Sequence, residues 1–240
     1  MDKRTHILWA IALLLMCSGT LRAQMNNPYV DDKIIHFGFS LGTNFMAYGI
    51  TESQDTINGE VYHARVSSML PGFSVGFITD VRLCRYLNLR FTPTLHFGQR
   101  LIRYKTDSGR EVKGSEGNGS NVEVLGLPLD VPLYLKWSAQ REKNYRPYVI
   151  AGGGISFDFG GQKERPVFQK NFDYFIAFGF GCDFYFRWFK FCPELKYHLG
   201  FANALTPVED RPQIPEQDEF YTRALSKLRN QMITITFNFE

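Results

Sequence analysis

The alternation of apolar and polar residues between Phe172 and Trp188 constrains this fold more than any other feature of the sequence. The even positions carry large apolar or aromatic side chains, whereas the odd positions are mostly small or polar, as at Asp173, Gly179 and Asp183. A period of two is typical of a β-strand whose two faces meet different environments. The run is much longer than the five or six residues of an average strand, so it predicts an unusually long one.

Seven further segments show the same alternation. They cover residues 35–45, 73–77, 87–97, 125–137, 149–157, 189–201 and 233–239. A strand that crosses a membrane at a tilt needs about 9–11 residues, and several of these segments reach that length. The sequence therefore predicts an all-β fold, namely an eight-stranded antiparallel transmembrane β-barrel, since single-chain bacterial barrels have an even number of strands.

The connections between these segments alternate in length. Short ones lie near residues 80–85, 139–144 and 187–190, and long ones lie near 50–65, 104–120, 160–171 and 202–229. Outer-membrane barrels combine short periplasmic turns with long outer loops. The pattern predicts that both chain termini lie in the periplasm.

The first residues have the layout of a secretory signal peptide. Lys3 and Arg4 precede an apolar run from Ile7 to Met16, and small residues lead up to Ala23. The apolar run is shorter than the roughly 20 residues of a spanning helix. We therefore expect residues 1–23 to be a cleaved signal peptide and residues 24–240 to form the barrel, with a retained anchor as the alternative.

The overall composition narrows the class of partner. The net charge of +3 is spread along the chain without a basic block, which does not indicate a nucleic-acid partner. Beyond residue 23 the cysteines are Cys84, Cys182 and Cys192. An odd number of scattered cysteines predicts neither a disulfide framework nor a zinc site.

A soluble ligand-binding barrel is the structural alternative, because alternation alone does not say which face is inside. One face carries the bulky aromatic residues, and the other is small or charged and includes Gly38, Gly42, Gly179 and Gly181. The interior of an eight-stranded barrel has room only for side chains or one small ligand. We therefore assign the aromatic face to lipid and the charged face to the lumen.

Several ionisable residues share the inward position. They form a predicted lumenal polar network of Arg90, His96, Asp130, Asp183, Glu194, Lys196 and His198. Buried charges must be paired, so we expect these residues to neutralise one another. A metal site made of His96, His198 and Glu194 is the alternative. The Gly152–Gly154 run lacks the following helix that a phosphate-binding loop requires, and we expect no cofactor and no small-molecule substrate.

A hydrolase active site inside or on the barrel is a further alternative. It needs a nucleophile, a base and an orienting group in one patch. Ser40, Ser74 and His36 share the inward position, but nothing in the sequence brings them together. We therefore predict that the protein is not an enzyme.

Four stretches of the sequence resemble the PorT family. They are residues 36–42, 146–154, 183–196 and 220–240, which include His36-Phe37-Gly38 and Arg146-Pro147-Tyr148. Members of that family are outer-membrane barrels of Bacteroidetes that serve the type IX secretion system and, in gliding species, motility. The resemblance implies a non-enzymatic role in protein export, with outer-membrane lipid and other secretion components as partners. It brings no defined set of functional residues.

The long connection at residues 202–229 is the predicted contact surface for a partner. From Glu216 to Arg229 we expect a helix, because Phe220, Ala224 and Leu228 recur at every fourth position. That helix either covers its own barrel or docks another secretion component.

Two classes of function remain open from the sequence. In the first, the barrel is an accessory of a protein-export machine. In the second, it is a self-standing structural or adhesive barrel whose outer loops bind an external surface. A protein-conducting channel is excluded for an eight-stranded barrel, because side chains fill its lumen.

Overall fold

The predicted all-β antiparallel barrel is confirmed by a computed structural model of the chain. The structure describes residues 26, 28–53, 56–57, 60–106, 121–160, 170–206, 221 and 223–240. The predicted signal peptide and Phe220 lie outside these residues. Where the chain is described, no helix is both long and apolar enough to span a membrane.

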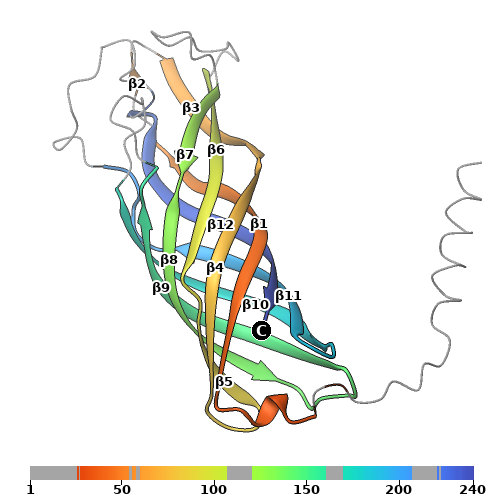
Figure 1. Cartoon of the computed structure of the whole chain (residues 1–240). Helices are drawn as coiled ribbons and strands as arrows, with labels where there is room; N and C mark the ends of the chain where they lie inside the picture. The colour runs from red at the N-terminus through yellow and green to blue at the C-terminus, as the bar shows by residue number, and fades with distance from the viewer. Residues whose placement is uncertain are drawn as a thin grey trace, which may run out of the picture.

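The described residues include twelve β-segments and a short 3-10 helix, η1 (Val30–Asp32), arranged along the chain as Figure 1 shows. The strands are β1 (Ile35–Glu52), β2 (Thr56–Ile57), β3 (Glu60–Met69), β4 (Pro71–Arg82), β5 (Leu87–Phe91), β6 (Thr94–Thr106), β7 (Asn121–Gly126), β8 (Pro128–Ser138), β9 (Tyr145–Asp158), β10 (Phe172–Tyr185), β11 (Lys190–Gly200) and β12 (Leu225–Phe239). All strand pairs are antiparallel.

The sheet closes into a ring because β1 pairs with β12 on one side and with β4 on the other. Three positions in the ring are occupied by two segments in succession, namely β3 with β4, β5 with β6, and β7 with β8. With the single strands β1, β9, β10, β11 and β12, these eleven segments occupy eight positions around the barrel, and the remaining segment, β2, pairs with β3.

A proline stands at each of these three interruptions. Pro71 begins β4, Pro93 separates β5 from β6, and Pro128 begins β8. Proline has no N–H to donate to a neighbouring strand, so the ladder breaks locally. The Pro93 carbonyl still accepts a hydrogen bond from the Phe77 amide at 3.0 Å, which keeps the two segments in the same wall.

The two ends of the barrel differ. At one end, which we call the turn end, short connections join β4 to β5, β8 to β9, and β10 to β11, and the C-terminus lies there (Figure 1). The opposite end, the loop end, carries the long connections. A two-residue turn links Phe186 to Phe189 through a 3.0 Å backbone hydrogen bond. β10 therefore stops at Tyr185, three residues before the end of the alternating pattern.

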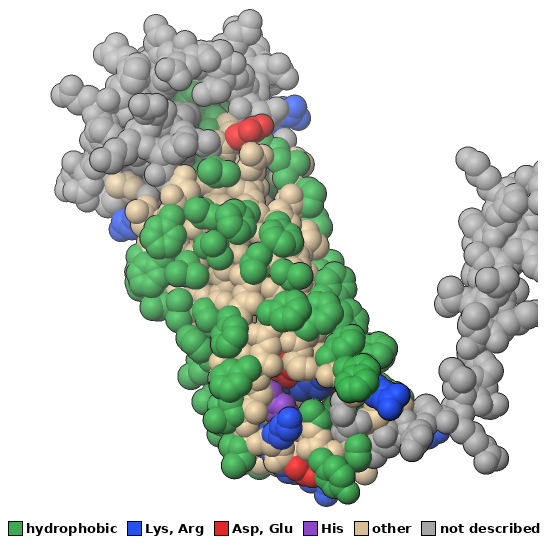
Figure 2. Space-filling model, viewed as in Figure 1, with side chains coloured by type: hydrophobic (Ala, Val, Ile, Leu, Met, Phe, Trp, Pro, Cys, Tyr) green, Lys and Arg blue, Asp and Glu red, His purple; other side chains and the backbone are tan. Residues whose placement is uncertain are grey.

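The two faces of the wall are sharply different. Phe178, Phe180 and Phe184 on β10 are 54%, 61% and 40% exposed on the outside. Apolar side chains cover much of the visible outer surface, and charged ones appear mainly near the two ends (Figure 2). A lipid environment can accept such a surface, whereas water would penalise it.

The expected helix over residues 216–229 is wrong for its final part. Residues from Leu225 onward belong to β12, and Leu228 pairs with Ile50 of β1. The four-residue spacing was ambiguous, because a strand with an irregular register can also bury such residues. The ladder between β12 and β1 shifts its register between Thr51 and Glu52, and the paired backbone of β1 favours the extended form.

Candidate functional site

The seven residues of the predicted lumenal network are all buried in the barrel interior. Each of these residues is between 1% and 6% exposed: Arg90, His96, Asp130, Asp183, Glu194, Lys196 and His198. The structure divides them into two groups along the barrel. One group surrounds Arg90 near the turn end, and the other surrounds Asp130 further up the lumen.

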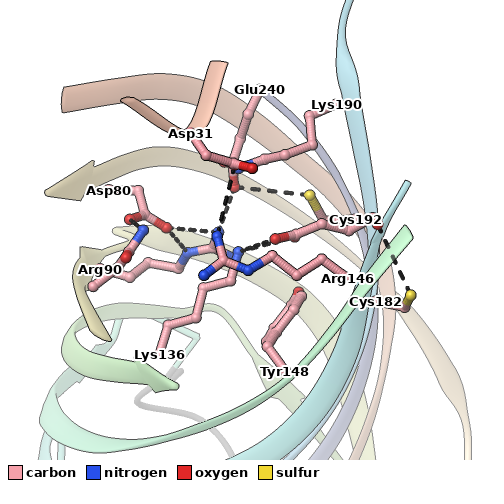
Figure 3. A network of polar contacts seen from close by, with 12 residues as sticks. Asp31, Asp80, Arg90, Lys136, Arg146, Tyr148, Cys182, Lys190, Cys192 and Glu240 are labelled. Atoms are coloured by element: carbon pink, nitrogen blue, oxygen red, sulfur yellow. Dashed lines mark hydrogen bonds and ion pairs between the residues drawn. The ribbon is translucent and has the colours of Figure 1, made fainter. Parts of the chain in front are cut away.

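Arg90 of β5 binds three carboxylates from three different parts of the chain. Figure 3 shows two of them, Asp80 and Glu240. The Nε of Arg90 donates to Oδ2 of Asp80 at 2.9 Å, and its Nη1 donates to Oε2 of Glu194 at 3.2 Å. Its Nη2 donates to Oε1 of Glu240, the last residue of the chain. Arginine suits this position because its planar group offers five donors in fixed directions.

Three lysines supply the remaining positive charges that neutralise the carboxylates around Arg90. Lys136 donates to both oxygens of Asp183 at 2.9 and 2.8 Å. Lys196 lies 2.6 Å from Glu194, and Lys190 pairs with Glu240. We call the following residues the Arg90 cluster: Arg90, Lys136, Lys190, Lys196, Asp80, Asp183, Glu194 and Glu240. Its four cations face four carboxylates, so the cluster is neutral overall.

Aromatic and small residues shape the space around the cluster. The Tyr148 hydroxyl donates to Glu194 at 2.8 Å, and the Lys136 ammonium lies 4.1 Å from the centre of the Tyr148 ring. Gly179 faces Lys196 across the ladder, and a Cβ atom at Gly179 would lie 2.8 Å from the Lys196 side chain. The glycine therefore leaves room for the lysine that the cluster needs.

Sequence reasoning missed half of the Arg90 cluster, namely Asp80, Lys136, Lys190 and Glu240. Lys136 and Lys190 alternate with outward residues, so their position in the period was the available signal. Asp80 falls in the short connection predicted near residues 80–85, whereas the structure places it in β4. Glu240 follows the last alternating segment, and it meets Arg90 only because the ring closes between β1 and β12.

The side chain of Glu240 lies just beyond the last strand and is held as a carboxylate. Burial would by itself raise the pKa of this group. The positive charges of Arg90 and Lys190 outweigh burial, and they lower the pKa below its ordinary value. The group therefore acts as an ionised anchor between β5, β11 and the end of β12.

The second group places a serine, a histidine and an aspartate in a row. Ser74 Oγ lies 2.8 Å from Nδ1 of His96, and Nε2 of His96 lies 3.3 Å from Oδ2 of Asp130. His198 approaches the same aspartate oxygen at 3.5 Å. Asn44 also donates to Ser74 at 2.8 Å. The serine expected in a hydrolase site therefore contacts His96, and not His36.

The order of groups is that of a nucleophilic triad, but the serine is closed off. Ser74 is 1% exposed and lies between Asn44 and His96. A cavity of about 30 Å³ reaches Asp130 and His198 from the loop-end side without touching Ser74. Because Ser74 is buried and does not line that cavity, an acyl substrate could not reach the serine oxygen through it.

The predicted metal alternative is not assembled. Glu194 faces Arg90 and Lys196, whereas His96 and His198 meet at Asp130. In the part of the chain that the structure describes, no group of three or more His, Cys, Asp or Glu residues is placed to hold a metal ion. Cys84 is exposed, Cys182 is half-buried and Cys192 is buried, and all three are free thiols.

The loop end of the lumen is closed by an apolar cluster. We call it the loop-end cluster, and it contains Tyr48, Ala64, Ile102, Tyr104, Val122, Val124, Ala204, Leu205, Tyr221, Ala224, Leu225 and Leu228. The Tyr104 hydroxyl donates to the carbonyl of Tyr221 at 2.9 Å. The chain after residue 220 thus packs inward over the end of the barrel.

This packing concerns two of the three residues of the predicted partner contact, Ala224 and Leu228, whereas Phe220 lies outside the described residues. Ala224 is 1% exposed and Leu228 is fully buried, so neither side chain can meet another protein. Both belong to the loop-end cluster, where exclusion of water stabilises apolar side chains. The predicted alternatives are that this segment covers its own barrel or docks another component. The structure agrees with the first for these two residues, because both help to close the loop end of the lumen.

The turn end is closed by the segment that precedes β1. The Tyr185 hydroxyl donates to Asp31 of η1 at 2.9 Å, and Arg141 lies 3.4 Å from the other oxygen of Asp31. Asn26 donates from its backbone amide to the Asn144 side chain at 2.8 Å. These contacts hold Asn26 and η1 against the turn between β8 and β9 and the end of β10, below the Arg90 cluster.

Several solved structures of outer-membrane proteins are similar to this chain. OprG of Pseudomonas aeruginosa is 11% identical with a TM-score of 0.48, and the match covers 92% of this chain and 98% of OprG. Neisserial surface protein A is 8% identical with a TM-score of 0.40, and the match covers 86% and 98% of the two chains. The membrane protein AlkL is 13% identical with a TM-score of 0.38, covering 92% and 93%.

A search of curated protein sequences found no match. The profile of the family described as outer membrane protein beta-barrel domain matches residues 22–206, which is most of the sequence. The closed antiparallel ring, the apolar outer face and the charged lumen are what such a domain requires. The chain therefore belongs to the outer membrane protein beta-barrel domain family.

Proposed function

We propose that this outer-membrane barrel is a non-enzymatic, non-conducting component of protein export by the type IX secretion system. The resemblance of residues 36–42, 146–154, 183–196 and 220–240 to the PorT family supports this assignment. In the proposed orientation the turn end and both termini lie in the periplasm, and the loop end faces the exterior. The short connections at the turn end support that orientation.

The observation that carries the proposal is the filled lumen. The Arg90 cluster occupies the interior near the turn end, and the loop-end cluster occupies the opposite end. Opening a path for a polypeptide would separate several buried ion pairs, and each separated charge would cost several kcal/mol, on the order of 3–5. The barrel therefore acts through its surfaces, as a membrane-anchored scaffold for other export components.

The exposed apolar residues of the turn end support this surface as the contact site. Ile34 is 69% exposed and Leu83 is 54% exposed. The backbone segments that carry them are neighbours, because the amide of Arg82, next to Leu83, donates to the Ile34 carbonyl at 2.8 Å. Ala224 and Leu228, two of the three residues of the competing surface that the sequence suggested, are buried, whereas the third, Phe220, lies outside the described residues.

Deletion of the chromosomal copy, followed by complementation, tests the proposal. We expect deletion to abolish the release of many cargo proteins and wild-type protein to restore it. The double variant Ile34→Glu, Leu83→Glu should fail to restore release while its barrel still resists unfolding on unheated gels. The matched control is Ser226→Glu, an exposed site at the loop end, which should restore release.

Unchanged cargo release after deletion would refute the export role. It would favour the second candidate, a self-standing barrel that binds an external surface through its loop end. The observation in favour of that candidate is a group of basic side chains on β3 and β6 at the loop end. Binding of cells to immobilised surfaces, with and without the gene, distinguishes the two.

A further inference from the structure

A groove runs along the outer face of β9, between β8 and β10. Two rows of paired residues line it, and each row crosses β8, β9 and β10 in that order: Leu135–Ala151–Phe178 and Trp137–Val149–Phe180. In both rows the middle residue, on β9, is smaller than its two neighbours, so the wall is hollowed there. The hollow has a volume of about 430 Å³, and each of its lining residues is apolar or glycine. We call it the β9 groove.

Small side chains also cover the wall between the β9 groove and the turn end. Cys182 pairs with Pro147, whose carbonyl accepts a hydrogen bond from the Ala139 amide at 2.9 Å. These residues form the next row on the same face, because residues two apart along a strand share a face. Beyond them the Tyr185 amide donates to the Asn144 carbonyl at 2.9 Å, so the β8–β9 turn lies beside the end of β10. A long, thin apolar occupant lying along β9 would therefore reach these turns.

Three exposed basic side chains lie in the turns around this end of the groove. They are Arg85 between β4 and β5, Lys143 between β8 and β9, and Arg187 between β10 and β11. In the described part of the chain, none of the three forms an ion pair. Arg85 and Arg187 lie over the rings of Tyr86 and Trp188, at 5.6 and 5.3 Å. Such aromatic rings are enriched at the boundary between membrane and water, so these cations lie at the depth of lipid headgroups.

The acidic groups near these turns leave the three cations available. Between residues 24 and 33 the acidic residues are Asp31 and Asp32, and both are paired with arginines. The three turns contain one acidic residue, Glu142. The side chain of Glu240 belongs to the Arg90 cluster. Even if the terminal carboxylate of Glu240 is counted with Glu142, the three cations outnumber the free carboxylates.

We infer that the β9 groove binds an acyl chain of an anionic phospholipid, whose phosphate lies against Lys143 and Arg187. The chain belongs to a family of outer-membrane barrels, so the medium that meets this wall is lipid. Burial of acyl methylene groups in the hollow contributes affinity for any phospholipid. The two cations form charge-assisted hydrogen bonds with phosphate, and they favour a headgroup with a net negative charge over a zwitterionic one. This site requires no secretion component, so it goes beyond the export role proposed above.

The test uses Trp137, which lines the groove, as a fluorescent reporter. From residue 24 onward the tryptophans are Trp137 and Trp188, so Trp188→Phe leaves Trp137 as the single emitter of the mature barrel. Phosphatidylglycerol or phosphatidylcholine with brominated acyl chains is titrated into this barrel in detergent, because bromine quenches tryptophan only at short range. We expect saturable quenching, with phosphatidylglycerol binding about 25-fold more tightly, since each of two cations near an anionic lipid contributes about fivefold.

One pair of variants tests the groove. Val149→Phe, Ala151→Phe fills it with apolar side chains and should weaken the binding of both lipids by about tenfold, as expected when roughly two methylene contacts are lost. The matched control Leu41→Phe, Val75→Phe adds two phenylalanines at facing positions on the outer face of β1 and β4, and should bind like the unfilled barrel. All four substitutions keep the wall apolar, and the gel shift of unheated samples verifies folding.

A second pair of variants tests the headgroup contact. Lys143→Gln, Arg187→Gln should weaken the binding of phosphatidylglycerol by about 25-fold and leave that of phosphatidylcholine unchanged. The matched control Lys227→Gln, Arg229→Gln removes the same two residue types from β12 at the loop end, and should keep the preference for phosphatidylglycerol.

Three results would overturn the inference. One is equal affinity of the unfilled barrel for the two lipids, and another is an equal loss of binding in either variant and its matched control. The third is the absence of saturable quenching by both lipids; if the barrel then purifies as a dimer, a second copy occupies the groove. The assay contains no secretion components, so its outcome is independent of the export proposal.

Discussion

The guanidinium of Arg90 is bound inside the barrel by the side chain of Glu240, which lies 150 residues further along the chain. The same Glu240 also pairs with Lys190, and its backbone exchanges hydrogen bonds with that of Lys190 at 2.7 and 2.9 Å. The end of the chain therefore ties β5, β11 and β12 together across the lumen. Glu240 thus joins β12 to β11 through its backbone, and its side chain neutralises Arg90 and Lys190.

Removing the central cation should destabilise the barrel strongly. Arg90→Met leaves Asp80, Glu194 and Glu240 without their shared partner, and we expect a loss of about 3–5 kcal/mol in the free energy of unfolding. Urea unfolding of the refolded barrel in lipid vesicles, followed by tryptophan fluorescence, measures it. The control Arg187→Met removes an exposed arginine that lies over Trp188 and should cost about 1 kcal/mol or less. Similar stabilities for both variants would contradict the central role of Arg90.

A charged side chain on the outer face should destabilise the barrel more, the deeper it lies in the membrane. Phe180→Arg places a cation on a side chain that is 61% exposed to the surroundings of the barrel. We expect a cost of about 2–4 kcal/mol near the bilayer midplane and less toward either surface. Phe180→Leu keeps the position apolar and serves as the control in the same unfolding assay. Equal tolerance of arginine and leucine would mean that Phe180 does not face lipid.

A charge placed in the loop-end cluster should disturb folding rather than binding. Leu228→Glu buries a carboxylate among apolar side chains, and we expect a loss of more than about 3 kcal/mol. Ser226→Glu, two residues away on an exposed position, should change stability by about 0.5 kcal/mol or less. Protease resistance of the two variants in vesicles reports the difference. A stable Leu228→Glu barrel would reopen Leu228 as a surface for a partner.

Acid should weaken the contribution of Glu240. Its pKa is lower in the folded protein than in the unfolded chain, so its stabilisation is complete above the unfolded value of about 4.3. The stabilisation is then lost as the pH falls toward the folded pKa. We therefore expect Glu240→Gln to have a lower free energy of unfolding than wild type near neutral pH. This difference between the two proteins should become smaller from about pH 5 to pH 3. If the difference in the free energy of unfolding stayed constant over this pH range, an ionised Glu240 could not be its cause.

The sequence by itself determined the class of fold and the orientation of the strand faces. The period of two is a local property, and it distinguishes Phe178, Phe180 and Phe184 from the inward Asp183 without reference to any other strand. It also indicated the strand positions, because alternation persists wherever one face meets lipid and the other meets a polar interior.

Only the tertiary structure decided which inward groups meet. The approach of Ser74 to His96, and of Glu240 to Arg90, depends on the register and closure of strands distant in sequence. It also decided that Leu228 lies in a strand and is buried, since a spacing of four fits both a helix face and an irregular strand. Periodicity shows only which way a side chain points, whereas its partner is set by the ring of long-range backbone hydrogen bonds around the whole barrel.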